Sequence, residues 1–443
     1  QKIKQSRKRL LLFCLKIEKV IKMKKYMMAV SILGMIIVFL LYTITNKESY
    51  NQKDMESEVS FAEIKKETTM IRVLIKTNGF KKDVHKSVEI SAENGLIVED
   101  EEGKSEYQEN EHVIIKSDGK IRTITPKKSD DKLKIHSITR GYGTPMYRGT
   151  LMLYPVDEGI AIINELPLEE YLYPVVPSEM PSSYHLEALK AQAICARCYA
   201  YNQMKNVSYP EFNAHVDDSV SFQVYNNSKE QDNSTKAVIE TAGQKLWYED
   251  QVAMTYFYST SSGKSTSVEA WGTKLIDSNQ YLKGVAISND NGDDYEEKLA
   301  WYRWSAKIPE EILEKLVESN CGKEIGSLKK VEITKKGPGG VVLEMEISGT
   351  KDSITVKTEN KIRKVLGGDG YKITKQDGKT INSMQLLPSA FFDIEKSGEY
   401  FIINGGGYGH GIGMSQNGAN ELAKAGKNYK EILEFFYPGT KVK

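Results

Sequence analysis

The chain has 443 residues, enough for two domains or for one large domain with a substantial core. Its 61 Lys and Arg residues nearly balance its 60 Asp and Glu residues. The resulting formal charge of +1 argues against nucleic acid as a partner, because phosphate contacts need a basic surface.

An uncharged apolar segment lies near the N-terminus, at residues 26–45. Its length is close to the ~20 residues that a helix needs to cross a bilayer, and the lysines before it predict a cytoplasmic N-terminus and an extracytoplasmic body. A cleaved signal peptide is the alternative, but its apolar region is usually ~7–15 residues long. We therefore expect a single-pass cell-membrane anchor at 26–45. It would follow a basic cytoplasmic tail at 1–25, in which 1–22 are not native if translation starts at Met23.

The rest of the chain is predicted to be α+β, a strand-rich body with one prominent helix. A charged tether at 46–67 precedes short runs of β-branched residues, broken by turn signals, that predict a β-rich region at 68–165. An alanine-rich pattern predicts a closely packed helix from Leu186 to Met204. Further strands, a helix in PEEILEKLVESN, a strand pair around Gly-Pro-Gly-Gly and two short C-terminal helices complete a core domain at 166–443.

Two cysteines of that helix, Cys195 and Cys198, form a C-x-x-C pattern. A redox C-x-x-C is typically placed at a helix N-terminus, where the helix dipole lowers a thiol pKa, whereas this pair lies in the middle of the predicted helix. No second pair follows at zinc-ribbon spacing. We expect two small buried residues.

Glu179 lies between two prolines, in Pro177-Ser178-Glu179-Met180-Pro181. The proline rings predict a rigid turn. The apolar neighbours would disfavour the charged form, raise the carboxyl pKa and suit Glu179 to act as a general acid. The alternative is a helix lead-in with Glu179 exposed, and the local sequence leaves both open.

A glycine-rich segment near the C-terminus, GGGYGHGIGMSQNG, contains the polar side chains of His410 and Gln416. It is not a Walker A loop, since no Gly-Lys-Ser/Thr follows, and Ser415 is not in a G-x-S-x-G nucleophile elbow. The six histidines form no H-E-x-x-H pair, which argues against a zinc hydrolase. The segment indicates a binding groove.

Several motifs occur together and in one order from about residue 70 to the end: LPLEEYLYPVVPSEMP, EALKAQAICARCYAY, SFQVY, YFYSTSSGKS, IRKVLG, LPSAFF and GYGHGIGMSQNGANELAKAGKNYKEILEFFYPGT. By these motifs the chain resembles the stage II sporulation protein D family, whose domain is shared with amidase-enhancer proteins. The resemblance implies a membrane-anchored lytic transglycosylase. It would cut the MurNAc–GlcNAc bonds of stem-peptide-free peptidoglycan to 1,6-anhydro products during sporulation engulfment.

The resemblance also implies roles for individual residues. Glu179 matches the family's catalytic glutamate. Supporting positions in a substrate groove are Arg197, Tyr199, Gln223, Tyr225, Ser262, His410, Ser415 and Gln416. The implied partners are peptidoglycan glycan strands, a cell-wall amidase and other engulfment membrane proteins, with no cofactor.

One departure from the family concerns a metal site. Some members carry a Cys/His zinc site just before the Q-V-Y motif, but residues 215–222 of this chain contain no cysteine. We therefore predict no structural zinc, and one zinc per chain by elemental analysis would contradict this. The alternative function is a glycan-binding activator of a cell-wall amidase with little or no catalysis of its own.

Overall fold

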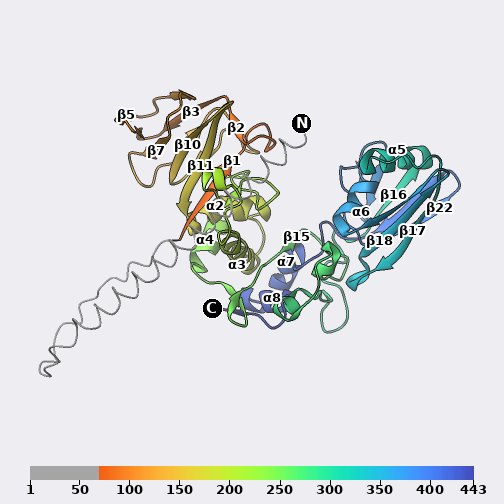
Figure 1. The fold of residues 1–443 in the computed structure, drawn as a ribbon. Coiled ribbons are helices and arrows are strands. Elements are labelled where there is room, and N and C mark those ends of the chain that lie inside the picture. Colours follow the sequence, from red (N-terminus) through yellow and green to blue (C-terminus); the bar gives the residue numbers. More distant parts are fainter. Residues whose placement is uncertain (1–68) are drawn as a thin grey trace, which may run out of the picture. The chain divides into compact units, whose positions relative to one another are not determined.

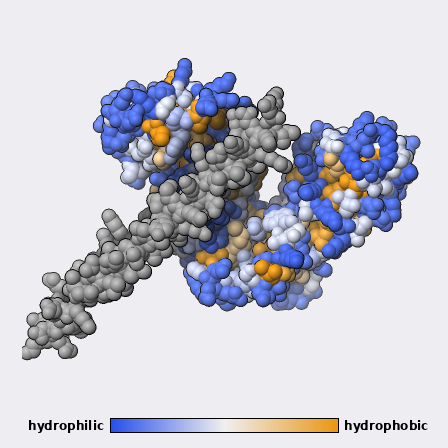
Figure 2. Space-filling model, in the orientation of Figure 1, coloured by the Kyte–Doolittle hydropathy of each residue, from blue (hydrophilic) through white to orange (hydrophobic). Residues whose placement is uncertain are grey.

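The computed structural model describes residues 69–443, which belong to one compact unit beginning at Glu67. The tail, anchor and tether expected at 1–67 lie outside the described residues. Among the residues that are described, no helix combines the length and apolar character that a membrane crossing requires. The face drawn in Figure 2 is largely hydrophilic, with apolar residues in small groups, as on a surface that contacts water.

The first part of the unit contains two sheets (Figure 1). The larger has the order β12-β1-β11-β10-β7-β4-β5, with β2 also paired to β11. Its strands are β1 (Met70–Ile75), β2 (Val84–His85), β4 (Leu96–Asp100), β5 (Gly103–Tyr107), β7 (Arg122–Pro126), β10 (Thr150–Val156), β11 (Gly159–Pro167) and β12 (Val216–Asp217). The smaller, β6-β3-β8-β9, consists of β3 (Ser87–Ala92), β6 (Val113–Lys116), β8 (Leu133–Ile135) and β9 (Met146–Tyr147). The strands predicted in this region are confirmed.

Strand β1, which lies between β12 and β11, buries both of its faces. Ile71, Val73 and Ile75 belong to the main hydrophobic core, while Leu74 points to a separate apolar cluster on the other face. Strand β12 pairs with β1 in parallel, so a segment far along the chain is joined to the edge of this sheet. This junction matters for the site, because the loop after β12 forms part of it.

Helices pack beside this sheet, and their bounds are α2 (Leu168–Glu179), α3 (Leu186–Gln203), α4 (Asp232–Glu240), α7 (Gln416–Lys424) and α8 (Tyr429–Phe436). The prominent helix predicted from the alanine pattern is α3, which contacts the other four. Its N-terminus is capped by His185, whose side chain accepts the N–H of Glu187. Cys195 and Cys198 are fully buried in α3, as expected, and burial raises the pKa of the Cys198 thiol to about 11.

Short strands and turns connect these helices. The strands are β13 (Leu246–Tyr248), β14 (Gln251–Val252), β15 (Phe257–Tyr258), β24 (Met414–Ser415) and β25 (Lys441–Val442). The 3-10 turns are η1 (Pro210–Phe212), η2 (Val268–Trp271), η3 (Asp277–Leu282) and η4 (Pro338–Gly340). Strand β15 pairs in parallel with β24, which brings the glycine-rich segment beside residues 257–258.

A second hydrophobic core lies within residues 304–403. Two sheets enclose it, in the orders β21-β20-β16-β23-β22 and β17-β18-β19, together with two helices (Figure 1). The elements are β16 (Trp304–Pro309), α5 (Glu310–Cys321), β17 (Leu328–Lys336), β18 (Val342–Gly349), β19 (Ser353–Lys357), α6 (Glu359–Leu366), β20 (Lys372–Lys375), β21 (Thr380–Asn382), β22 (Phe392–Ser397) and β23 (Tyr400–Gly405). The predicted helix in PEEILEKLVESN and the strand pair around Gly-Pro-Gly-Gly are α5 and β17–β18.

The prediction of a rigid turn around Glu179 is wrong. Residues 168–179 form helix α2, with Pro174 and Pro177 inside it and Glu179 as its last residue. The helix persists because its apolar side chains are buried and because the Ser178 hydroxyl donates to the Pro174 carbonyl at 2.6 Å. Met180, at the C-cap, is already extended, in keeping with the restriction that the following proline imposes.

Candidate active site

A pocket of about 350 Å³ contains the Glu179 carboxyl group, and we refer to it as the Glu179 pocket. Its lining comes from α2, α3, the loop after β12, residues 255–257, η2 and the glycine-rich segment. The lining residues are Glu179, Tyr199, Val220, Ser221, Phe222, Gln223, Val224, Thr255, Tyr256, Phe257, Trp271 and His410. Four of the residues predicted from the sequence therefore meet in one place: Glu179, Tyr199, Gln223 and His410.

The Glu179 carboxyl group is half-buried and poorly supplied with donors. The N–H of Val224 donates to its Oε1 at 2.8 Å, and no residue within 69–443 donates to Oε2. Burial raises the pKa of Glu179 to about 7, and the bond from Val224 opposes that rise only in part. The group can therefore hold a proton near neutral pH, and one of its oxygens remains available to a ligand.

The backbone of Glu179 is held by the C-terminal part of the chain. Gln416, the first residue of α7, donates from Nε2 to the Glu179 carbonyl at 3.0 Å and to Gln192 Oε1 at 3.4 Å. Gln416 thus lies next to the candidate acid without lining the pocket. A side chain in this position orients the end of α2.

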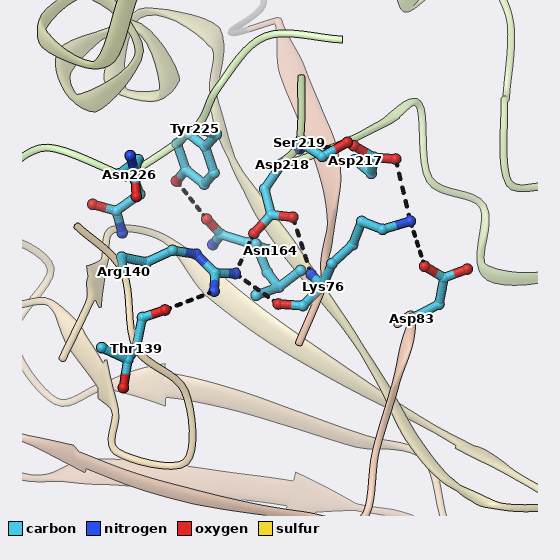
Figure 3. Close-up of polar contacts among 12 residues, drawn as sticks. Lys76, Asp83, Thr139, Arg140, Asn164, Asp217, Asp218, Ser219, Tyr225 and Asn226 are labelled. Carbon is cyan, nitrogen blue, oxygen red and sulfur yellow. Dashed lines mark hydrogen bonds and ion pairs between the residues drawn. The ribbon is translucent and has the colours of Figure 1, made fainter. Parts of the chain in front are cut away.

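The loop that supplies Val224 is fixed at its beginning by a buried ion-pair network, drawn in Figure 3. Asp218 accepts hydrogen bonds from the Arg140 guanidinium and from the Lys76 backbone N–H, and its side chain is fully buried. The Lys76 ammonium lies 3.6 Å from Asp217 and 2.6 Å from Asp83. These contacts tie the start of the loop to β1 and to the turn before β9.

The end of the same loop is also fixed. The Tyr225 hydroxyl donates to Asn164 Oδ1 of β11 at 2.7 Å (Figure 3). The Ser178 hydroxyl accepts the N–H of Asn227 at 3.2 Å, which links the loop directly to the residue before Glu179. With both ends held, the loop places Gln223 and Val224 in the lining of the pocket.

Aromatic side chains form another part of the lining. The rings of Tyr256 and Trp271 meet edge-on with centroids 4.7 Å apart, and the ring of His410 lies 5.0 Å from that of Trp271. The Trp271 indole N–H donates to the buried Glu359 carboxylate at 2.9 Å, which fixes the plane of the ring. Rings held in this way offer flat apolar faces to a ligand.

His410 is neutral in this setting. Burial lowers its pKa to about 3, helped by the positive charge of Arg363. Its Nδ1 accepts the N–H of Ile412 at 3.1 Å. His410 therefore cannot serve as a cationic acid at neutral pH, and it contributes its ring to the wall.

Gln223 has an unusual environment for an amide. The residue is 1% exposed, and neither its Oε1 nor its Nε2 has a hydrogen-bond partner within residues 69–443. Buried polar groups in native proteins are almost always paired, because an unpaired group loses its hydration without compensation. An amide in this state at the wall of a pocket is suited to bind polar groups of a ligand.

The other predicted positions lie outside the Glu179 pocket. Arg197 is fully buried and donates from Nε and Nη2 to the Glu169 carboxylate at 2.8 and 2.7 Å. Tyr225 packs against Tyr171 with ring centroids 4.9 Å apart. These positions give no support to the substrate contacts predicted for Arg197 and Tyr225, because their polar groups are taken up inside the fold.

Ser262 and Ser415 also lie elsewhere. The Ser415 hydroxyl is buried, donates to Glu296 Oε1 at 2.8 Å and accepts the N–H of Gly418 at the start of α7. Ser262 lines a different pocket, formed mainly by β16, β20, β22 and β23. The groove expected around all these positions is therefore smaller than the resemblance implied.

The sequence reasoning missed Tyr256 and Trp271, together with the donor role of the Val224 backbone. Trp271 stands in VEAWG, where one tryptophan in a polar, glycine-containing stretch is a weak signal of a binding wall. A backbone N–H carries no side-chain signal at all. Within residues 69–443, no cluster of three or more His, Cys, Asp or Glu side chains has the arrangement of a metal site.

Comparison with protein families gives two matches. Residues 156–248 match the family described as stage II sporulation protein, and residues 244–413 match a domain of unknown function. The first match includes α2, α3 and the loop after β12, hence Glu179 and Gln223. The second includes Trp271 and His410, which also line the pocket.

Individual relatives cover most of the described chain. An uncharacterized protein of Brachyspira hyodysenteriae is 32% identical over 299 residues, which are 67% of this chain and 72% of the relative. Stage II sporulation protein D of Bacillus subtilis is 32% identical over 300 residues, covering 63% of this chain and 75% of that protein. A Bacillus subtilis protein named amidase enhancer is 30% identical over 289 residues, covering 60% of this chain and 39% of that protein. The chain belongs to the stage II sporulation protein D family.

Proposed function

We propose that this protein is a peptidoglycan lytic transglycosylase with Glu179 as its acid. The observation that carries the proposal is the single carboxyl group among the described residues that line the pocket. Most glycoside hydrolases need a second carboxyl group about 5–10 Å from the first, as nucleophile or as base for water. A pocket with one carboxyl group suits a reaction in which the substrate supplies its own nucleophile.

The chemistry follows from this arrangement. Protonated Glu179 donates its proton to the oxygen between N-acetylmuramic acid and N-acetylglucosamine, and the bond from C1 to that oxygen breaks. The 6-hydroxyl of the muramic residue attacks C1, and its proton passes to the Glu179 carboxylate, which restores the acid. The product is a 1,6-anhydro sugar, and no water is consumed. An intramolecular hydroxyl has a high effective concentration, so the protein mainly supplies the proton and the orientation.

The remaining lining fits a sugar substrate. The flat faces of Trp271 and Tyr256 suit the apolar faces of pyranose rings. The unpaired amide of Gln223 can both donate to and accept from hydroxyl or N-acetyl groups. The Trp271 ring is held by its hydrogen bond to Glu359, which lowers the entropic cost of ordering it on binding.

We further propose that the protein acts outside the cytoplasm in sporulation, anchored by residues 26–45 and joined to its body by a tether at 46–67. Within the body, residues 68–165 would support a catalytic core at 166–443. Glycan strands without stem peptides are the proposed substrate, so a cell-wall amidase is a proposed partner. The names of the Bacillus subtilis relatives, a sporulation protein and an amidase enhancer, support this assignment.

A second function has a specific observation in its favour. The relative named amidase enhancer matches 60% of this chain, so a role in stimulating an amidase is the alternative. Such a role needs a glycan-binding pocket and places no demand on the protonation of Glu179. Activity measurements therefore separate the two functions.

The experiment compares the full chain with its Glu179→Gln variant on glycan strands that lack stem peptides, with products identified by mass spectrometry. Anhydro-ended fragments from the parent and none from the folded variant are expected. A Glu170→Gln variant is the matched control, because Glu170 lies on α2 but does not line the pocket. Binding without cleavage by the parent would establish the alternative.

The pH dependence gives a second measurement. Glu179 donates a proton only in its neutral form, and its pKa is raised to about 7. We therefore expect kcat to be highest on the acid side of that pKa and to fall tenfold per unit on its alkaline side. A rate that is flat from pH 5 to 9 would exclude Glu179 as the acid.

A further inference from the structure

A second pocket, of about 570 Å³, lies at the edge of the sheet formed by β16, β20, β22 and β23, and we refer to it as the Arg303 pocket. Polar and basic side chains surround an aromatic floor made by Trp304, Phe391 and Phe392. The polar and basic members are Ser262, Arg303, Ser305, Lys336, Thr374, Lys375, Gln376, Asp393 and Asn404. None of the residues that line the Glu179 pocket takes part in it.

The charge of the Arg303 pocket is positive. Three cations line it against one carboxylate, that of Asp393, which pairs with Lys336 at 2.7 Å. Arg303 and Lys375 have no carboxylate within salt-bridge distance in the part of the chain that the structure describes. Two positive groups at one pocket therefore have no counter-charge among residues 69–443.

Both of these cations are held in place. The Arg303 guanidinium lies over the Tyr302 ring at 3.9 Å and donates from Nη1 to the carbonyls of Tyr302 and Ser262. The Lys375 ammonium lies 5.5 Å from the centre of the Trp301 ring. These contacts use one nitrogen of Arg303 and the aromatic attraction of Lys375, so both groups keep donors for an anion.

The Arg303 pocket is connected to the Glu179 pocket by two short segments that pair with each other. Gly406 lines the former and His410 the latter, and these residues are four positions apart, a span of at most ~14 Å. On the neighbouring segment, Ser262 lines the Arg303 pocket and Phe257 lines the Glu179 pocket. A backbone bridge joins the two segments at Thr260 and Tyr408. The two pockets are therefore separated by only a few residues along both of these paired segments.

We propose that the Arg303 pocket is a subsite for the carboxylate of a stem-peptide-free muramic residue, next to the disaccharide at Glu179. The inference rests on the proposed function, because it assigns the pocket to the same glycan. Hydrolysis of the amide between the lactyl group and the stem peptide leaves a carboxylate on each muramic residue. A stripped strand therefore carries one negative charge per disaccharide at this position, where an intact strand carries a neutral amide and a bulky peptide.

The subsite would select stripped strands by charge. Arg303 and Lys375 supply the attraction, while the amides of Gln376 and Asn404 and the hydroxyls of Ser305 and Thr374 can bind sugar hydroxyls. Because these groups lie away from Glu179, they act on binding and leave the proton transfer unaffected. The proposal thus predicts changes in KM and not in kcat.

The test measures KM and kcat on two substrates: stripped strands, and the same strands with the lactyl carboxyl groups converted to methylamides. For the parent, the methylamide should raise KM about tenfold. On stripped strands, Arg303→Gln and Lys375→Gln should each raise KM about threefold, the size expected for a partly exposed ion pair. Lys375→Arg keeps the positive charge and should have the KM of the parent. On methylamide strands these variants should match the parent, which a folding defect would not produce.

A matched control is Lys329→Gln, which removes an exposed positive charge on β17 outside the pocket and should leave both constants unchanged. Equal KM for free and methylamide strands in an active parent would overturn the subsite while leaving the proposed function intact. If the parent cleaves neither strand, binding constants replace KM and the same comparison applies. Binding of poly(glycerol phosphate) that needs Arg303 and Lys375, with no dependence on the lactyl carboxylate, would also overturn it.

Discussion

Two carboxyl groups of this protein, those of Glu179 and Glu296, have a pKa raised to about 7 by burial, but they lie in different surroundings. Glu296 is fully buried and accepts the N–H of Ser261 at 3.0 Å, the Ser261 hydroxyl, and the Ser415 hydroxyl at 2.8 Å. Glu179 is half-buried, accepts one backbone N–H and lines a pocket.

The difference teaches that a raised pKa does not identify a catalytic acid. A perturbed carboxyl group is a candidate on physical grounds, but internal networks perturb pKa values as well. Glu296 has donors on both oxygens and joins residues 261 and 415 into one structure. Glu179 lines a pocket, and one of its oxygens has no donor among residues 69–443. The combination of a raised pKa with an available oxygen is why we propose Glu179, and not Glu296, as the acid.

The largest effect expected from this comparison is on turnover. Glu179→Ala should lower kcat by about 10²–10⁴-fold, the usual contribution of a general acid, with a free energy of unfolding within about 1 kcal/mol of the parent. The protein remains folded because only the Val224 N–H loses its acceptor, and solvent in the pocket can replace it. Glycan cleavage and urea titration measure the two quantities. Retention of more than a tenth of the parent rate by a folded variant would contradict the assignment.

The converse variant, Glu296→Ala, should affect stability and not chemistry. It leaves the Ser261 N–H and the Ser415 hydroxyl buried without an acceptor, at a cost of about 2–4 kcal/mol in the free energy of unfolding. Measured well below its melting temperature, its kcat should remain within about fivefold of the parent. A loss of activity as large as that of Glu179→Ala, in a fully folded protein, would mean that Glu296 takes part in catalysis.

The pH dependence of stability gives a third and smaller effect. Between the ordinary glutamate pKa and about 7, the unfolded chain loses the Glu179 proton while the folded protein keeps it, so the free energy of unfolding falls as pH rises. Glu179→Gln removes this loss. The variant should match the parent near pH 4 and exceed it by about 1–3 kcal/mol at pH 8. Melting temperatures across that range test it, and parallel curves would show that the pKa is not raised.

The smallest effect concerns Gln223. Its amide has no partner among the residues that the structure describes, whereas the oxygens of Glu296 accept hydrogen bonds. Gln223→Met keeps the shape and removes an unpaired buried amide, so the free energy of unfolding should rise by about 1 kcal/mol. At the same time KM for glycan should rise about tenfold. A variant that is less stable than the parent would show that the amide is satisfied within the protein.

The resemblance and the local pattern predicted part of the site. Burial raises the carboxyl pKa of Glu179, which is one of the two interpretations that its apolar, proline-flanked sequence left open, and the alanine pattern located α3. The sequence pattern did not reveal that the Arg197 guanidinium donates to the Glu169 carboxylate, because that ion pair joins residues 28 positions apart and leaves no periodic signal. Family positions likewise do not distinguish a residue that lines the pocket from one that supports it.

By itself the sequence determined the class of the fold, the prominent helix and the carboxyl group in apolar surroundings, because these depend on residue types at short spacing. Only the tertiary structure decided which groups face that carboxyl. Val224 reaches Glu179 across 45 positions, and the aromatic wall comes from two further segments, residues 255–271 and His410. Contacts of this range arise from sheet pairing and from buried ion pairs such as Asp218 with Arg140, which bring together segments whose local patterns are independent.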